Sequence, residues 1–179
     1  MTRKKALIII APNDFQDIEF LHTKEELEKG KIKIVIASTK KETAKGMQGT
    51  IVKVDLPLKQ VDIKNYDAII FIGGLGASPY YRNKKVHSII NEAYSNEKKI
   101  CAICVAPLIL AKAGILKGKR ATVYDLNIKE LAQMLKDEGA IYTGKQVEVD
   151  GNIITANGPN SARKFGRTIV KELNKQKKN

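Results

Sequence analysis

Four runs of apolar, mostly β-branched residues predict buried strands along the chain. They cover residues 6–11 (ALIIIA), 32–37 (IKIVIA), 67–72 (DAIIFI) and 100–104 (ICAIC), and turn or helix signals bound each of them. Strands that are apolar on both faces are typical of a parallel sheet covered by helices, and segments of helical periodicity separate most of these runs. The pattern predicts a three-layer α/β/α sandwich with a mostly parallel central sheet.

Helical spacing of apolar residues predicts the outer layers. The first helix is expected to take Asn13 or Asp14 as its N-cap and to end at Gly30, with this glycine in the left-handed region. The other helices are expected after Gly74, beside Cys104, and over residues 126–138 and 161–174.

One β-hairpin is predicted near the C-terminal end of the chain. Residues 147–149 and 153–155 are strand-like, and Asp150-Gly151 between them is the dipeptide that best fits a type I′ turn. We expect this hairpin to extend one edge of the sheet. The sequence has no linker, repeat or low-complexity segment, which predicts a single domain over residues 1–174 and a basic tail at 175–179.

Length and charge narrow the class of protein. The 179 residues suffice for one well-buried core. The net charge of +13 raises the question of nucleic-acid binding, but the lysines are scattered over every segment and no aromatic stacking array lies among them. No stretch of eighteen apolar residues occurs. We therefore expect a cytoplasmic protein that binds neither nucleic acid nor membrane.

The two cysteines, Cys101 and Cys104, have the CxxC spacing found in redox and zinc sites. In an extended strand their side chains would point to opposite faces, and the sequence offers no second Cys or His pair for a tetrahedral metal site. The sequence therefore predicts reduced thiols and no metal. Cys101, among apolar neighbours, is expected to be a buried core residue.

Cys104 stands where a buried strand ends and the apolar helix that contains Pro107 begins. A thiol at a helix N-terminus lies at the positive end of the helix dipole, which favours the thiolate and lowers the pKa. The carboxyl ends of parallel strands are also where ligands usually bind. These arguments favour Cys104 as a nucleophile over another buried small residue.

A nucleophile needs hydrogen-bond donors for a developing oxyanion and a group that manages its proton. Gly73, Gly74 and Gly76 close a central strand, where backbone N–H groups could approach a substrate. We take the N–H groups of Gly74 and Val105 as the candidate oxyanion donors. The same glycines would equally serve a tight strand-to-helix turn.

Glu19 is the candidate for moving the proton. On the first helix it is expected to share a face with Phe15 and His22, close to Ile18, and a carboxyl group in such surroundings would have a raised pKa. A surface glutamate paired with Lys24 fits the same helix geometry. Helix geometry alone leaves both interpretations open.

At these residues the chain resembles the DJ-1/PfpI superfamily, related to class I glutamine amidotransferases. The resemblance runs nearly end to end, through NDFQDIE, DAIIFIGG, AICVAP, AGILKGKRATVY and VEVDGNIITANGP, in that order. It implies a flavodoxin-like sandwich with Cys104 as nucleophile on a strained turn, Glu19 as the acid that contacts it, and Gly74 with Val105 as oxyanion donors. It also implies a homodimer or higher homo-oligomer.

The chain departs from the superfamily at three positions. Peptidase-like members have a histidine after the cysteine and a glutamate four residues beyond the double glycine, where this chain has Val105 and Ser78. The branch that resembles human DJ-1 has a histidine where this chain has Tyr124, which can shape the pocket beside Gly73 but cannot relay protons as imidazole does. Neither His22 nor His87 replaces it by spacing.

The resemblance implies a cysteine-dependent, cofactor-independent enzyme that acts on a reactive small-molecule aldehyde or a glycated substrate, as a glyoxalase III or deglycase with a role in stress or repair. An alternative is a redox-sensing or chaperone-like protein in which Cys104 is oxidised to a sulfinate. A PfpI-type intracellular cysteine peptidase is the third interpretation, and Val105 and Ser78 disfavour it.

Overall fold

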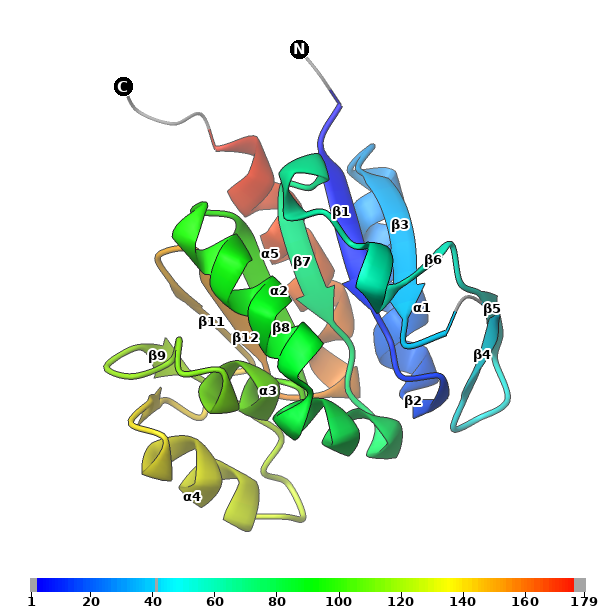
Figure 1. Ribbon diagram of the computed structural model, residues 1–179. Coiled ribbons are helices and arrows are strands. Elements are labelled where there is room, and N and C mark those ends of the chain that lie inside the picture. The colour runs from blue at the N-terminus through cyan, green and yellow to red at the C-terminus, as the bar shows by residue number, and fades with distance from the viewer. Residues whose placement is uncertain (1–2, 41, 176–179) are drawn as a thin grey trace.

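Strands and helices alternate along the chain around a seven-stranded sheet (Figure 1). The computed structural model describes residues 3–40 and 42–175, so the tail predicted at 175–179 lies outside the described residues except for Lys175. The strands are β1 (Lys5–Ile9), β2 (Asn13–Phe15), β3 (Lys33–Ser38), β4 (Thr43–Gly46), β5 (Ile51–Lys53), β6 (Leu56–Pro57), β7 (Ala68–Phe71), β8 (Lys99–Ile103), β9 (Arg120–Ala121), β10 (Ile141–Tyr142), β11 (Val147–Asp150) and β12 (Ile153–Ala156). The helices are α1 (Asp17–Lys29), α2 (Lys84–Ser95), α3 (Pro107–Lys112), α4 (Glu130–Asp137) and α5 (Ala162–Asn174), with 3₁₀ helices η1 (Leu58–Gln60), η2 (Ile63–Asn65), η3 (Leu75–Arg82) and η4 (Pro159–Ser161).

The main sheet has the strand order β11-β12-β8-β7-β1-β3-β6. Its neighbouring strands are parallel, apart from the antiparallel pair of β11 and β12 at one edge. Helices α1 and α5 cover one face, and α2 and α3 cover the other (Figure 1). The predicted three-layer sandwich and its edge hairpin are confirmed.

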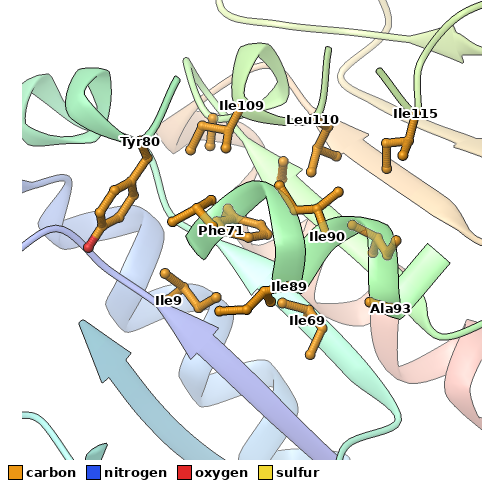
Figure 2. Packing of buried hydrophobic residues seen from close by; sticks show 14 of the residues in the cluster. Ile9, Ile69, Phe71, Tyr80, Ile89, Ile90, Ala93, Ile109, Leu110 and Ile115 are labelled. Atoms are coloured by element: carbon orange, nitrogen blue, oxygen red, sulfur yellow. The ribbon is translucent and has the colours of Figure 1, made fainter. Parts of the chain in front are cut away.

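Alternating side chains of the central strands fill two cores, one on each face of the sheet. In β1, Leu7 and Ile9 pack with α2 and α3, whereas Ala6 and Ile8 pack with α1 and α5. Figure 2 shows the first of these cores, where Ile9 and other strand residues meet the helices on that face. Both faces are buried, which explains why the sequence of each central strand is continuously apolar.

The edge hairpin has a different turn from the predicted one. Asp150 pairs with Ile153 inside the ladder, so the two-residue loop is Gly151-Asn152 and not Asp150-Gly151. Of these two loop residues only Gly151 has a positive φ, at 63°. A type I′ turn needs positive φ at both central residues, so that prediction was wrong.

Both predicted ends of the first helix also need correction. Residues Asn13–Phe15 form β2, and Gln16 is the N-cap of α1, accepting the backbone N–H of Glu19. At the other end Gly30 has φ −74°, and Lys31 takes the left-handed conformation with φ 58°. Glutamine is an uncommon cap, and this explains why the sequence pointed to the earlier Asn-Asp pair.

The four other predicted helices also differ from the sequence pattern. The segment after Gly74 is the 3₁₀ helix η3, and α2 begins only after Asn83, whose side chain caps it by accepting the N–H of Val86. Helix α4 is shorter than the predicted range 126–138, and α3 has only six residues. Helix α5 begins one residue later than expected, with Ser161 as its N-cap.

A second, three-stranded sheet, β2-β4-β5, lies beside the start of α1. Asp17, in the first turn of α1, is buried and accepts the N–H groups of Gln48 and Thr50 at 2.8 and 2.9 Å. These hydrogen bonds tie the β4–β5 hairpin to the helix start. Among the described residues, no helix has the length and apolarity needed to cross a membrane.

Candidate active site

The backbone turns sharply at Cys104, directly after β8 ends at Ile103. Cys104 has φ 67°, a left-handed conformation that costs a non-glycine residue about 1 kcal/mol or more. Two backbone hydrogen bonds of 2.9 Å hold it there, one from the Cys104 N–H to the Ala156 carbonyl and one from the Tyr124 N–H to the Cys104 carbonyl. Strand β12 and the segment after β9 therefore hold the strained turn that the resemblance implied.

This turn also brings the two cysteines to one side of the sheet. Cys101 and Cys104 both pack into the core formed with α1 and α5, so the prediction that they point to opposite faces was wrong. Cys104 comes after the strand, where the left-handed backbone breaks the alternation of faces. Both thiols are free, and residues 3–40 and 42–175 contain no group of three His, Cys, Asp or Glu side chains able to hold a metal ion.

The Cys104 thiol is surrounded by groups with opposing effects on its ionisation. Burial, followed by the adjacent Glu19 carboxylate, raises the pKa of Cys104, while the N–H groups of Val105 and Gly74 act to lower it. The side chain is only 7% exposed. Helix α3 is too short to supply the full dipole that the sequence suggested, so these two N–H groups are what favours the thiolate.

Glu19 is completely buried and lies beside this thiol. Its Oε2 accepts the Gly73 N–H at 2.9 Å, and the Gln16 N–H in turn donates to the Gly73 carbonyl at 3.0 Å, which fixes the start of α1 against the end of β7. Within the described part of the chain, Oε1 has no hydrogen-bond partner among nitrogen and oxygen atoms. Burial raises the pKa of Glu19 to about 7, against the opposing effects of the Cys104 and Gly73 hydrogen bonds.

This burial predicts a stability that depends on pH. Between the ordinary pKa of 4.5 and about 7, the folded protein keeps a proton on Glu19 that the unfolded chain has released. Glu19 should therefore contribute most to the free energy of unfolding below pH 4.5. This contribution should fall by about 3 kcal/mol as the pH rises through 7.

Denaturant unfolding of wild type and Glu19→Gln from pH 4 to pH 8 measures this effect. The other titrating groups contribute equally to both proteins, so they cancel from the difference in unfolding free energy. This difference, wild type minus variant, should fall with rising pH. A difference that stays constant over this range would show that folding does not raise the pKa of Glu19.

The two glycines after β7 let the chain segments approach one another. A Cβ at Gly73 would lie 2.7 Å from the Cys104 Cβ and 2.9 Å from Glu19 Oε2. Gly74 has φ 105°, and a Cβ there would lie 2.4 Å from the carbonyl oxygen of Asp14. The thiol, the carboxyl and the N–H donors can therefore meet only if both positions lack a side chain.

The structure brings Cys104, Glu19, Gly73, Gly74 and Val105 together. It places the predicted Phe15 neighbour of Glu19 in β2, outside the helix. Tyr124 is half-buried beside Cys104, to whose carbonyl its backbone bonds. Ser78, by contrast, is exposed on η3.

Tyr81 also lies at this site, although it was not predicted from the sequence. Its hydroxyl donates to the Val105 carbonyl at 3.3 Å, and burial together with the charge of the nearby Cys104 thiolate raises its pKa to about 12. Tyr81 lies seven residues after Gly74, in a segment whose 3₁₀ form the sequence does not reveal, so the sequence alone does not indicate which way its side chain points. This hydrogen bond holds the peptide group that follows the candidate oxyanion donor, the Val105 N–H.

Comparisons with known proteins identify the family of the chain. The sequence model of the DJ-1/PfpI family matches residues 4–172. The chain is 40% identical to an uncharacterized protein of Methanocaldococcus jannaschii, over 98% of this chain and 85% of the relative. It is 31% identical to a protein of Pyrococcus horikoshii named a deglycase, over 93% of this chain and 98% of the relative.

Two further proteins extend the comparison. A Caenorhabditis elegans protein named a glutathione-independent glyoxalase is 29% identical over 96% of this chain and 89% of the relative. The crystal structure of a ThiJ/PfpI domain protein from Brachyspira murdochii superposes with a TM-score of 0.91 at 29% identity, covering 97% of this chain and 98% of that one. From the family match over nearly its whole length, the chain belongs to the DJ-1/PfpI family.

Proposed function

We propose that the protein is a cysteine-dependent enzyme that converts 2-oxoaldehydes such as methylglyoxal to hydroxy acids without a cofactor. The observation that carries this proposal is the buried Glu19 carboxyl lying against the Cys104 thiol, with the N–H groups of Gly74 and Val105 on the same sulfur. A relative named a deglycase and another named a glyoxalase support a reactive carbonyl as the substrate.

In this mechanism the Cys104–Glu19 pair shares one proton. The reactive form carries the proton on Glu19 and the negative charge on sulfur, where the two N–H groups stabilise it. A carboxyl with a pKa of about 7 is suited to give and take a proton near neutral pH.

The reaction then needs no outside oxidant. The thiolate adds to the aldehyde carbon C1 of methylglyoxal, and Glu19 protonates the new oxyanion, which forms beside the Gly74 and Val105 donors. The Glu19 carboxylate next removes the C1 proton to give an enediol, and a proton is returned to C2. C1 is thereby oxidised and C2 reduced, and water hydrolyses the resulting thioester to lactate and free thiol.

The test is to incubate purified protein with methylglyoxal and to measure lactate. We expect lactate to form in proportion to methylglyoxal consumed, without added glutathione, metal or nucleotide. Glu19→Gln should lower kcat by about a hundredfold or more, because the amide cannot exchange the proton. Consumption of methylglyoxal without lactate would contradict the proposal.

The same site supports a second candidate, a redox sensor. A sulfinate on Cys104 would find the Val105 and Gly74 N–H groups and a protonated Glu19 as hydrogen-bond donors. This candidate is favoured if wild type and Cys104→Ser are equally inactive while mild peroxide adds two oxygen atoms at Cys104 alone. Robust casein cleavage that depends on Cys104 would instead favour the peptidase.

A further inference from the structure

A small cavity lies at the carboxyl end of β12, beside segments whose backbone is bonded to Cys104. Its volume is about 150 Å³, below the roughly 300 to 1,000 Å³ of sites that enclose a drug-sized molecule. The lining residues are Tyr124, Leu126, Gln146, Asn157, Gly158, Pro159, Asn160 and Ser161. A cavity of this size fits a fragment of a few carbon atoms.

Backbone hydrogen bonds connect the cavity to Cys104 on both sides. The Cys104 carbonyl accepts the N–H of Tyr124, and the Cys104 N–H donates to Ala156, the residue before Asn157. Tyr124, which lines the cavity, therefore bonds directly to the cysteine turn, and the lining residue Asn157 directly follows the other bonded residue. These hydrogen bonds fix the position of the cavity relative to the Cys104 turn.

Hydrogen bonds orient three polar groups of the lining as donors. The Ser161 hydroxyl donates to Asn157 Oδ1 at 2.6 Å, and Lys164 Nζ donates to Gln146 Oε1 at 3.4 Å, so each amide keeps its NH₂ for another partner. The Tyr124 hydroxyl accepts from Asn127 Nδ2 at 3.4 Å and keeps its own proton to donate. The cavity thus presents N–H and O–H groups to a ligand rich in oxygen.

All eight lining residues are uncharged, although the chain as a whole is strongly basic. A site for a carboxylate or phosphate is usually built with arginine or lysine in contact with the anion. The exposed side chain of Leu126 and the ring of Tyr124, which lies against Gly158, add apolar surface for C–H groups. Neutral amides, hydroxyls and an aromatic ring together match a neutral polyhydroxylated chain.

We propose that this cavity is a subsite for the hydroxylated tail of a sugar-derived 2-oxoaldehyde whose aldehyde reacts at Cys104. The inference rests on the proposed function and names its substrate class. The preferred substrate is then a longer, sugar-derived dicarbonyl compound rather than the three-carbon methylglyoxal.

Competition between two 2-oxoaldehydes tests the subsite. The probes are 3-deoxyglucosone, which has a hydroxylated tail, and methylglyoxal, which has none. We expect Gln146→Leu to lower the ratio of kcat/KM for 3-deoxyglucosone to kcat/KM for methylglyoxal by about tenfold, which is the effect of losing one good hydrogen bond. Gln146 is exposed, so the variant should fold, and its thermal midpoint checks this. Gln133→Leu, an exposed glutamine on α4, is the matched control and should leave the ratio unchanged.

Calorimetric titration of 3-deoxyglucosone into Cys104→Ser and into Cys104→Ser/Gln146→Leu gives a readout that does not depend on turnover. We expect the second protein to bind it several-fold more weakly. An unchanged ratio together with unchanged binding would overturn the subsite and leave methylglyoxal turnover, and hence the proposed function, standing. If neither 2-oxoaldehyde is turned over, the proposed function fails, and the titration alone decides the subsite.

Discussion

Serine in place of Cys104 is expected to lower kcat/KM for methylglyoxal by at least about a thousandfold. In other enzymes whose catalytic residues act together, removing the nucleophile lowers the rate by this factor or more. A hydroxyl is far harder to ionise than a thiol, and the surroundings of Cys104, with its burial and its neighbouring carboxyl, already oppose a negative charge on this atom. Lactate formation under saturating and limiting methylglyoxal measures the effect.

Cys101→Ser is the matched control. Cys101 is also free and packs into the same core as Cys104, but it lies inside β8, and burial raises its pKa. This variant should lose some stability, because its hydroxyl is buried among apolar residues, yet keep activity within about threefold. Equal losses in the two variants would show that activity falls through the fold and not through the nucleophile.

Alanine at Gly74 is expected to destabilise the protein by at least about 3 kcal/mol, or to prevent folding. The new Cβ would lie 2.4 Å from the Asp14 carbonyl oxygen and 2.5 Å from the Gln16 backbone nitrogen. Both atoms belong to backbone that the Gln16–Gly73 hydrogen bond holds in place, so neither can move aside cheaply. Denaturant unfolding measures the loss.

Gly49→Ala separates this clash from backbone strain. Gly49 has φ 96°, close to the 105° of Gly74, but a Cβ there would meet nothing within 4 Å. Its alanine variant should lose only the cost of a positive φ, about 1 to 2 kcal/mol. If the two variants have the same stability, the segment from Asp14 to Gln16 does not press against Gly74 as the structure shows.

The sequence predicted the architecture because the central strands follow a simple rule. Residues such as Ile8 and Ile9 are buried on opposite faces, so every position of the strand must be apolar, and the run is easy to recognise. The ends of elements were less accurate. The N-cap at Gln16 and the 3₁₀ form of η3 lie where the segments after β2 and β7 are hydrogen-bonded to each other, which is a tertiary contact and not a local propensity.

The site was predicted unevenly for a similar reason. Helix geometry alone could not distinguish a buried Glu19 from a surface one, because the N–H of Gly73 that it accepts comes from a segment 54 residues away. Tyr81 and the lining residue Gln146 were missed, since each gains its place only through the packing of separate segments. The two cysteines were assigned to opposite faces because the rule of alternation was applied one residue beyond the end of β8.

The hydrogen bond from Cys104 to Ala156 bears on how the chain is made. During synthesis, Cys104 and Glu19 leave the ribosome long before Ala156 does. A nascent chain that has emerged only as far as α4 lacks the β12 carbonyl that holds the left-handed turn. The Cys104 turn therefore forms late in translation, after the sheet has received its strand β12. A truncated product released before that point carries the cysteine without the hydrogen bond that holds its left-handed turn.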